Sequence, residues 1–255
     1  MSIAMVLFVA TAQASLQTAV AGLLMLYQNN TPKLTTRKRL QLKISKKQKR
    51  VTRRQTTLEK SAVALRMQHR TRRLANQYLN GVVLMNFFGI TAAIFVVERF
   101  FDGALNLETL MILTGVIAAT SLIIYLFYYR KGTRLWLPRS IVNALLEEAG
   151  RVQNGLESFA FGLAMTVLEM PFTLALYLVV ANKLVQLEVG LQLTSIAVYL
   201  IIIALPLFVL RFKLRQQGEV ARMQKWRLEN KLALKILSGN IFLMLAFCML
   251  SFEVL

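Results

Sequence analysis

The sequence predicts an all-α membrane protein, a polytopic bundle of six transmembrane helices. Hydrophobic residues make up 56% of the 255 positions and the mean hydropathy is +0.53, more apolar than a soluble domain of this length needs. Six predominantly apolar stretches approach or exceed the roughly 20 residues that cross a bilayer. Basic residues are concentrated in alternate connections between these stretches. We therefore expect residues 1–255 to form a single membrane domain.

The six apolar stretches lie at residues 3–27, 81–97, 107–129, 156–181, 191–210 and 236–255. The first has no preceding basic segment and exceeds the usual signal-peptide length, which predicts a retained helix. The second is short, and the sixth begins beside Lys235, whose long side chain can reach the headgroups.

The connections differ sharply in charge. The chain has 31 Lys and Arg against 12 Asp and Glu, and 29 of the basic residues fall in the first, third and fifth connections. The positive-inside bias places such connections in the cytoplasm. We therefore expect both termini outside, in the cytoplasmic membrane of a prokaryote.

The first connection, residues 31–80, is predicted to be a basic cytoplasmic helical arm. Ile44, Val51, Leu58 and Leu65 recur every seven residues, which gives a narrow apolar stripe on a basic helix. The arm fixes topology and favours anionic inner-leaflet lipids, or it binds a cytoplasmic protein partner. Nucleic acid is the least favoured partner because the arm has few aromatic side chains for base stacking. The candidate lipid or partner contacts are Arg37, Lys38, Arg39, Lys46, Lys47, Lys49, Arg50, Arg53 and Arg54.

The fourth stretch contains a carboxylate next to a proline. Placing a charge inside a transmembrane helix costs at least about 2.5 kcal/mol, so Glu169 is expected to face the bundle interior. Pro171 lacks a backbone N–H and should kink or break the helix, which frees carbonyl groups beside Thr173. This combination predicts a midplane cation or proton site. The alternative is that Glu169 pairs with another polar group or is protonated, while Pro171 only shapes packing.

The first stretch carries an unusual number of polar side chains. Gln13 and Gln17 lie one helical turn apart and share a face, with Thr18 next to them. They either line a cavity opposite Glu169 or form hydrogen bonds across helices, as polar residues in membrane bundles often do. Asn86 in the second stretch is a further, less specific candidate.

The number of stretches predicts an inverted repeat. Three helices followed by three helices place the first and fourth in opposite directions across the membrane. SLQTA at residues 15–19 can be aligned with MPFTL at residues 170–174, and this alignment would make Thr18 and Thr173 equivalent. Paired irregular helices of this kind are typical of the central site in secondary transporters.

The second half of the chain resembles a known superfamily. WLPRS at 136–140, GLAMTVLEMPFTLALYLVV at 162–180 and KWRLENK at 225–231 are similar to segments of the transmembrane cytochrome c biogenesis proteins. Those proteins carry thiol electrons across membranes and belong to the broader lysine exporter superfamily. The similar spacing covers Glu169, Pro171, Thr173 and Tyr177. The resemblance implies an architecture of two inverted three-helix units.

The reactive residues of that superfamily are absent. Phe172 stands where the motif has its cysteine, and Leu174 and Ala175 replace its glycines. A thiol relay needs two exchanging sulfurs, whereas the chain has only Cys248. The resemblance therefore implies the architecture and not the redox chemistry, unless a partner supplies cysteines.

Two functions are consistent with these observations. The first is a small secondary transporter or exporter with Glu169 at a midplane site around a broken fourth helix. The second is a non-transporting membrane subunit or assembly factor whose basic arm binds a partner or anionic lipid. No nucleophile with its base and no metal-ligand set is present in the sequence, so we expect neither an enzyme nor a cofactor. The sequence leaves homo-oligomerisation open.

Overall fold

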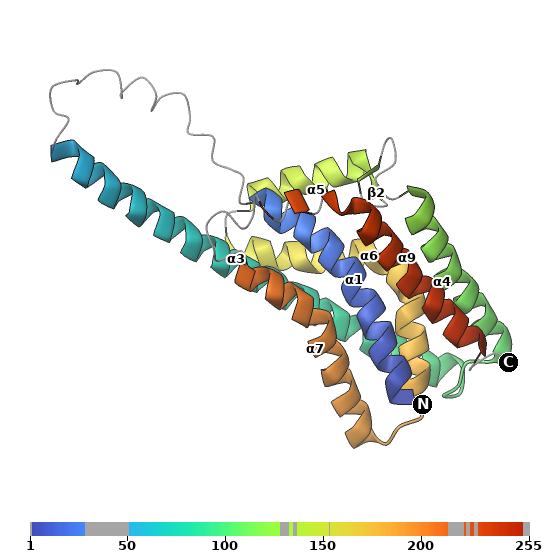
Figure 1. The fold of residues 1–255 in the computed structure, drawn as a ribbon. Coiled ribbons are helices and arrows are strands. Elements are labelled where there is room, and N and C mark those ends of the chain that lie inside the picture. The colour runs from blue at the N-terminus through green and yellow to red at the C-terminus, as the bar shows by residue number, and fades with distance from the viewer. Residues whose placement is uncertain are drawn as a thin grey trace.

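The computed structural model describes residues 2–28, 51–127, 133–134, 137–152, 154–213, 222, 225–226 and 229–251. Side-chain surroundings are described for residues 4–18 of the first helix and, within the long second helix, from Arg73 onward. The helices in this part of the chain are α1 (Ser2–Gln28), α3 (Val51–Phe100), α4 (Leu107–Phe127), α5 (Arg139–Arg151), α6 (Gly155–Leu184), α7 (Val189–Lys213) and α9 (Lys231–Met249) (Figure 1). A short antiparallel hairpin of β1 (Thr133–Arg134) and β2 (Leu137–Pro138) precedes α5.

The helices form the bundle of an integral membrane protein. Five segments are long and apolar enough to cross a bilayer: Arg73–Phe100, Leu107–Phe127, Gly155–Leu184, Val189–Leu210 and Lys231–Met249. In α1, the part with described side chains gives a shorter apolar helix, Ala4–Thr18. The sequence predicted six spans, and the described residues supply five.

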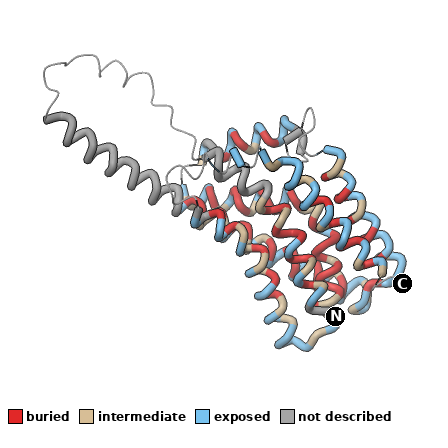
Figure 2. Tube along the Cα trace, viewed as in Figure 1, coloured by how far each residue is buried: buried red, intermediate tan, exposed pale blue. Residues whose placement is uncertain are grey.

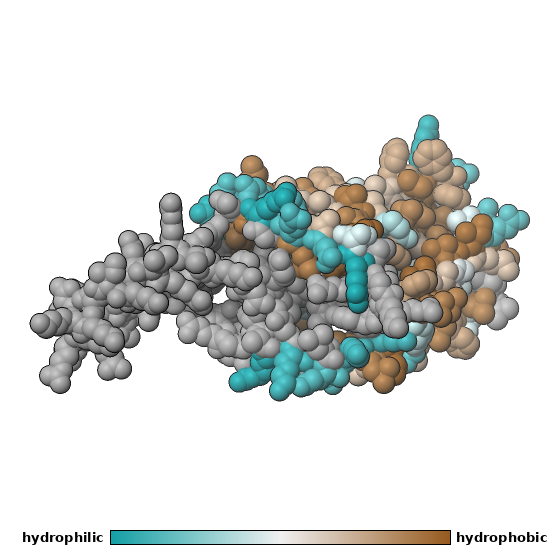
Figure 3. All heavy atoms as spheres, turned by 90° about the horizontal axis from the view of Figure 1, so that it is seen from above, coloured by the Kyte–Doolittle hydropathy of each residue, from teal (hydrophilic) through white to brown (hydrophobic). Residues whose placement is uncertain are grey.

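Large apolar side chains cover the outside of the bundle. Phe95 is 60% exposed and Phe247 is 68% exposed, which would be costly in water but is favourable against lipid. Buried residues line the inner faces of the helices, with exposed residues outside them (Figure 2). Seen from above, hydrophobic residues occupy much of the visible bundle surface, with hydrophilic residues in separate patches between them (Figure 3). This distribution supports contact with a lipid bilayer.

Helix α3 differs most from its sequence-based boundary. The apolar stretch at residues 81–97 is only the end of a continuous helix of 50 residues, and its membrane-compatible part begins at Arg73. Residues 73–80 are polar enough to lower the local hydropathy, yet no proline interrupts the helix before the apolar stretch. The second half of the predicted arm therefore continues directly into the membrane helix.

The structure does not describe the side chains of the basic residues that we expect to bind lipid or a partner on that arm. Arg37, Lys38, Arg39, Lys46, Lys47, Lys49 and Arg50 lie outside the described residues, and Arg53 and Arg54 are described only by their position on the α3 backbone.

The principal helix pairs each join the two halves of the chain. Helix α3 packs against α6, α1 against α7, and α4 against α9. Smaller contacts link α3 to α7, α1 to α6, α4 to α6 and α1 to α9. Helix α5 lies across the end of the bundle and packs on α1, with Val142, Leu146 and Ala149 on its buried face (Figure 1).

Helices α3 and α6 touch through their backbones. A Cβ atom on Gly81 would lie 2.2 Å from the carbonyl oxygen of Phe159, and one on Gly162 would lie 2.3 Å from that of Tyr78. Only glycine permits such an approach, because any side chain would separate the helices. These two glycines thus fix the position of α3 against α6.

The same two helices run parallel. Near the start of the α3 span, the Leu74 carbonyl oxygen accepts a hydrogen bond of 2.7 Å from Ser158 Oγ, near the start of α6. Beyond the end of α3, the Leu105 N–H donates to Asn182 Oδ1 near the end of α6, at 2.9 Å. Residues at the middle of both helices are consequently brought to similar depth.

Helices α4 and α9 form a second close pair. Ser121 Oγ donates to the carbonyl oxygen of Gly239 at 2.8 Å, and the Tyr125 hydroxyl donates to Asn240 Oδ1. A Cβ on Gly239 would lie 2.6 Å from the Tyr125 ring, so the glycine leaves room for it. These contacts hold α4, the last span in the first half of the chain, against α9, the last span in the second half.

Candidate functional site

A network of buried polar side chains joins the four helices α1, α3, α6 and α7. Asn86 Oδ1 on α3 accepts hydrogen bonds from Gln13 Nε2 of α1 at 2.6 Å, the Tyr177 hydroxyl of α6 at 2.8 Å and Gln17 Nε2 of α1 at 3.1 Å. These side chains are all almost fully buried. We call Gln13, Gln17, Asn86, Tyr177 and Tyr199 the central network.

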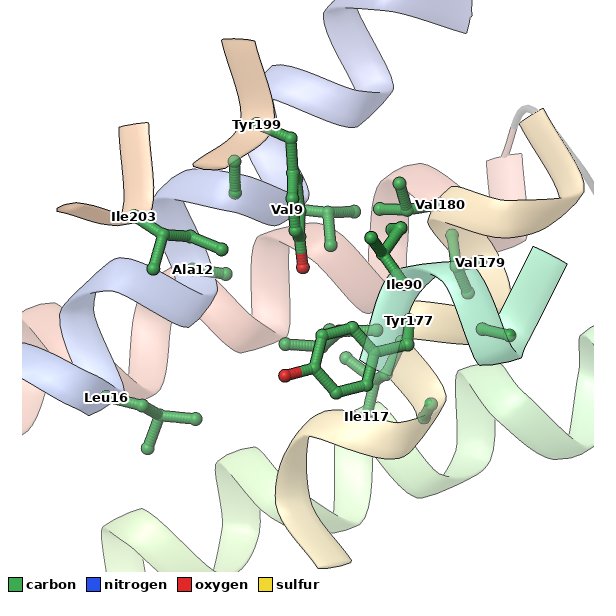
Figure 4. Close-up of a cluster of buried hydrophobic side chains, with 14 of the residues drawn as sticks. Val9, Ala12, Leu16, Ile90, Ile117, Tyr177, Val179, Val180, Tyr199 and Ile203 are labelled. Carbon is green, nitrogen blue, oxygen red and sulfur yellow. The ribbon is translucent and has the colours of Figure 1, made fainter. Parts of the chain in front are cut away.

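Gln13 connects this network to α7. Its Nε2 also donates to the Tyr177 hydroxyl at 3.0 Å, and its Oε1 accepts a hydrogen bond from the Tyr199 hydroxyl. The Tyr177 and Tyr199 rings lie among apolar side chains that include Val9 and Ile203 (Figure 4). Because the surroundings are apolar, the polar atoms must find their partners within the network.

Two features of α3 position the side chains of the central network: a hydrogen bond within the helix and a glycine. Asn86 Nδ2 donates to the carbonyl oxygen of Val82 at 2.7 Å, within the same helix. This bond holds the amide so that Oδ1 is free to accept hydrogen bonds from the other helices. A Cβ on Gly89 would lie 2.9 Å from the Tyr177 ring, so Gly89 provides the space that the ring needs.

Glu169 lies at the middle of α6, on the face that carries Thr173 and Tyr177 at successive turns. Its side chain is 8% exposed. Tyr177 lies two turns after it on the same helix, and Tyr78 lies on α3, which packs against α6. Between described side chains, the ion pairs are at exposed positions and none involves Glu169. Glu169 is therefore a buried acid with no basic partner in the described part of the protein.

Pro171 bends α6 but does not interrupt it. The helix is continuous from Gly155 to Leu184, and its two halves point in different directions (Figure 1). The missing N–H leaves the carbonyl of Val167 without its usual helical partner. Pro171 and Val167 are both exposed, whereas Glu169 is buried. Of the two expected outcomes, a kink or a break, the structure shows the kink, and Val167, whose carbonyl is freed, lies on the exposed side of α6 and not on the side of the carboxylate.

Of the remaining predicted site residues, Gln13, Gln17 and Thr173 are buried, and Thr18 is not. Gln13 and Gln17 form hydrogen bonds across helices, which is one of the two outcomes that the sequence left open. Thr173 is buried, and its Oγ1 donates to the Glu169 carbonyl oxygen at 3.2 Å. Thr18 is only half-buried and donates to Ala14 of its own helix, so it does not join the central network.

Several residues of the site were not expected from the sequence. Tyr199 and Tyr78 were not singled out, and Tyr177 was noted only for its spacing in the resemblance to the thiol carriers. A tyrosine in the middle of an apolar stretch carries a hydroxyl that needs a partner when buried. This rule applies to Tyr177 and Tyr199 and would have indicated both positions.

The chemistry available at this site is limited. Within the described ranges, no group of three His, Cys, Asp or Glu side chains could hold a metal ion. The central network consists of neutral amides and phenols, which can orient and hydrogen-bond but carry no charge at neutral pH. Glu169 is the acid of this region, and its carboxylate can attract a cation or exchange a proton.

Comparisons with family models, curated proteins and solved structures find no match for the chain. The fold and the site together define an integral membrane protein whose helical bundle has a hydrogen-bonded polar centre next to a buried carboxylate.

Proposed function

We propose that the protein is a small secondary transporter or exporter with six membrane-spanning helices, in which Glu169 couples transport to a cation or proton. The observation that carries this proposal is the burial of Glu169 at the middle of α6 with no ion-pair partner among the described side chains. An unpaired buried charge is strongly disfavoured, so such a carboxylate tends to take up a positive charge. A group that gains and loses that charge is what ion coupling requires.

Helix α1 is proposed as the sixth span. It contains 27 residues, which at about 1.5 Å per residue exceeds the roughly 30 Å of the hydrocarbon core. It also contributes Gln13 and Gln17 to the buried centre, so it packs inside the bundle. An α1 that lay on the membrane surface could not make these contacts.

The packing of the helices supports the proposed inverted repeat. Exchanging α1 with α6, α3 with α7 and α4 with α9 converts the α3–α6 pair into the α7–α1 pair. The same exchange converts α4–α6 into α9–α1, and it leaves the pairs α4–α9, α3–α7 and α1–α6 unchanged. The central network comes from the first two helices of each proposed unit. A pseudo-two-fold axis through that network would suit alternating access.

The resemblance to the lysine exporter superfamily remains part of this proposal for architecture alone. Cys248 is half-buried on α9, and the central network contains no sulfur. The proposed orientation follows the charge bias, with α5 on the cytoplasmic side and both termini outside, in a prokaryotic cytoplasmic membrane.

A flux experiment tests the proposal. Purified protein in proteoliposomes is screened for uptake of amino acids, inorganic cations and small peptides under an imposed proton gradient. For any transported solute, Glu169→Gln should reduce flux to the level of empty vesicles. Glu157→Gln is the matched control, because Glu157 lies on the same helix but is exposed. Unchanged flux in the Glu169→Gln variant would remove Glu169 from the mechanism.

A second candidate is a non-transporting subunit or assembly factor. Helix α3 begins at Val51, about six turns before its membrane-compatible part starts at Arg73, and this extension is rich in arginine. Such a helix could hold a cytoplasmic protein or anionic lipids. Deleting residues 36–72 distinguishes the two functions. If flux persists and binding to a partner or to anionic vesicles is lost, the extension is a docking element on a transporter.

A further inference from the structure

Gln17 has one buried oxygen that the central network does not use. The side chain is 3% exposed and its Nε2 donates to Asn86. Its Oε1 is fully buried and has no hydrogen-bond donor among the described residues. A buried carbonyl oxygen normally has a partner, so its position indicates where a donor or a cation would bind.

Gln17 and Glu169 lie on the same side of the central network. Helix α1 runs towards α5, and the C-terminal half of α6 runs away from it (Figure 1). Gln17 therefore lies closer to α5 than Gln13 does, and Glu169 lies closer to α5 than Tyr177 does. The Tyr177 side chain reaches back to that of Thr173, one turn from Glu169, as helical side chains tilt towards the N-terminus.

Tyr78 provides a third oxygen on this side. It lies two turns before Asn86 on α3, which runs parallel to α6. Tyr78 is buried, and its backbone lies against Gly162, two turns before Glu169 on α6. Oxygen-bearing side chains from α1, α3 and α6 are thus gathered next to the network.

The net charge of this group determines the ligand. The described part of α1 has no titratable side chain, α3 presents Tyr78, and α6 presents Glu169 and Tyr177. Helix α7 adds Tyr199, which is linked to Tyr177 through Gln13. Helix α4 has Glu108 near its start and Tyr125 near its end. One carboxylate without a described basic partner is neutralised by one positive charge. A divalent ion would leave an excess charge in an apolar environment.

We propose that Gln17 Oε1, the Glu169 carboxylate and the Tyr78 hydroxyl form a binding site for a single monovalent cation. The charge is carried either by a proton on Glu169 that is donated to Gln17 Oε1, or by Na⁺ bound to oxygens from all three residues. Oxygen ligands suit a hard cation of this kind. The inference rests on the proposed function in that it names the class of coupling ion. It concerns binding, so it can be tested without transport.

Labelling with a hydrophobic carbodiimide tests the site. This reagent modifies protonated carboxyl groups, and mass spectrometry of the α6 peptide reports modification of Glu169 in the full-length protein. If the ligand is Na⁺, adding Na⁺ at fixed pH should protect Glu169, and choline should not. If the ligand is a proton, labelling should fall as pH rises and should not respond to Na⁺. Labelling that responds to neither Na⁺ nor pH would overturn the proposal.

Gln17→Leu identifies the role of the amide oxygen. With Na⁺ as the ligand, this variant should need at least about tenfold more Na⁺ for half-protection, equivalent to about 1.4 kcal/mol. With a proton as the ligand, the midpoint of labelling should move to lower pH, because protonated Glu169 loses its acceptor. Thr11→Ala, an exposed change on the same helix, should leave the profile unchanged.

Two further measurements keep the test decisive. If Gln17→Leu does not fold, the shorter Gln17→Asn should give the same direction of change, and the wild-type profile still decides whether a cation binds. A Gln17 variant that folds and keeps the wild-type profile would exclude Gln17 from the site. Protection by Na⁺ or pH in a protein that transports nothing would support this inference while contradicting the proposed function.

Discussion

The Tyr177 hydroxyl donates a hydrogen bond of 2.8 Å to Asn86 Oδ1, which joins α6 to α3. The same two helices touch through their backbones at Gly81 and Gly162, nearer their N-terminal ends. One contact is steric and the other polar, and both set the depth of α3 against α6. That register brings the central network next to Glu169.

Replacing Asn86 should destabilise the bundle strongly. Asn86→Leu would leave donors of Gln13, Gln17 and Tyr177 to find other partners inside an apolar core. Each buried group left unsatisfied costs about 1–3 kcal/mol. The melting temperature of the purified protein in detergent measures the effect. The control is Asn80→Leu, at an exposed position on the same helix, and equal melting of the two variants would contradict the role of the network.

The two glycines at the crossing should not tolerate alanine. Gly81→Ala or Gly162→Ala puts a methyl group about where a backbone carbonyl now lies, so the helices must separate. Overpacking of this kind costs about 1–3 kcal/mol. Thermal unfolding should show the loss in both variants. Gly115→Ala is the matched control because nothing lies within 4 Å of its Cβ, and it should be neutral or slightly stabilising.

The two tyrosines of the central network should differ in importance. Tyr199→Phe removes the donor to Gln13 Oε1, for which the structure describes no second donor. Tyr177→Phe leaves Asn86 Oδ1 with two other donors. We therefore expect Tyr199→Phe to cost about 1–3 kcal/mol and Tyr177→Phe to cost less. Denaturant or thermal unfolding of the two variants compares them directly, and the reverse order would show that the assignment of donors is incorrect.

The orientation can be measured with single cysteines. In a Cys248→Ser background, Glu148→Cys on α5 and Gln186→Cys after α6 place exposed thiols at opposite ends of α6. A membrane-impermeant maleimide should label the first from the cytoplasmic side and the second from the outside. Labelling of both from one side would mean that α6 does not cross the membrane.

The sequence predicted the helical class and most of the membrane helices because hydropathy is a local property that each segment carries by itself. It also identified Glu169, since a carboxylate within a long apolar stretch is conspicuous. It did not predict that α3 extends back to Val51, because polar residues lower the hydropathy without ending the helix. The direction in which Pro171 faces was likewise not evident, since it depends on which side of α6 is buried.

The sequence by itself determined which segments can lie in a membrane and which polar side chains must be accommodated there. Only the tertiary structure decided which of those side chains meet. Gln13 and Tyr199 are 186 residues apart, and their hydrogen bond exists because α1 packs against α7. Asn86 and Tyr177 meet because two glycines allow the backbones of α3 and α6 to touch. Buried polar atoms find partners through packing, and packing depends on residues that lie far apart in the chain.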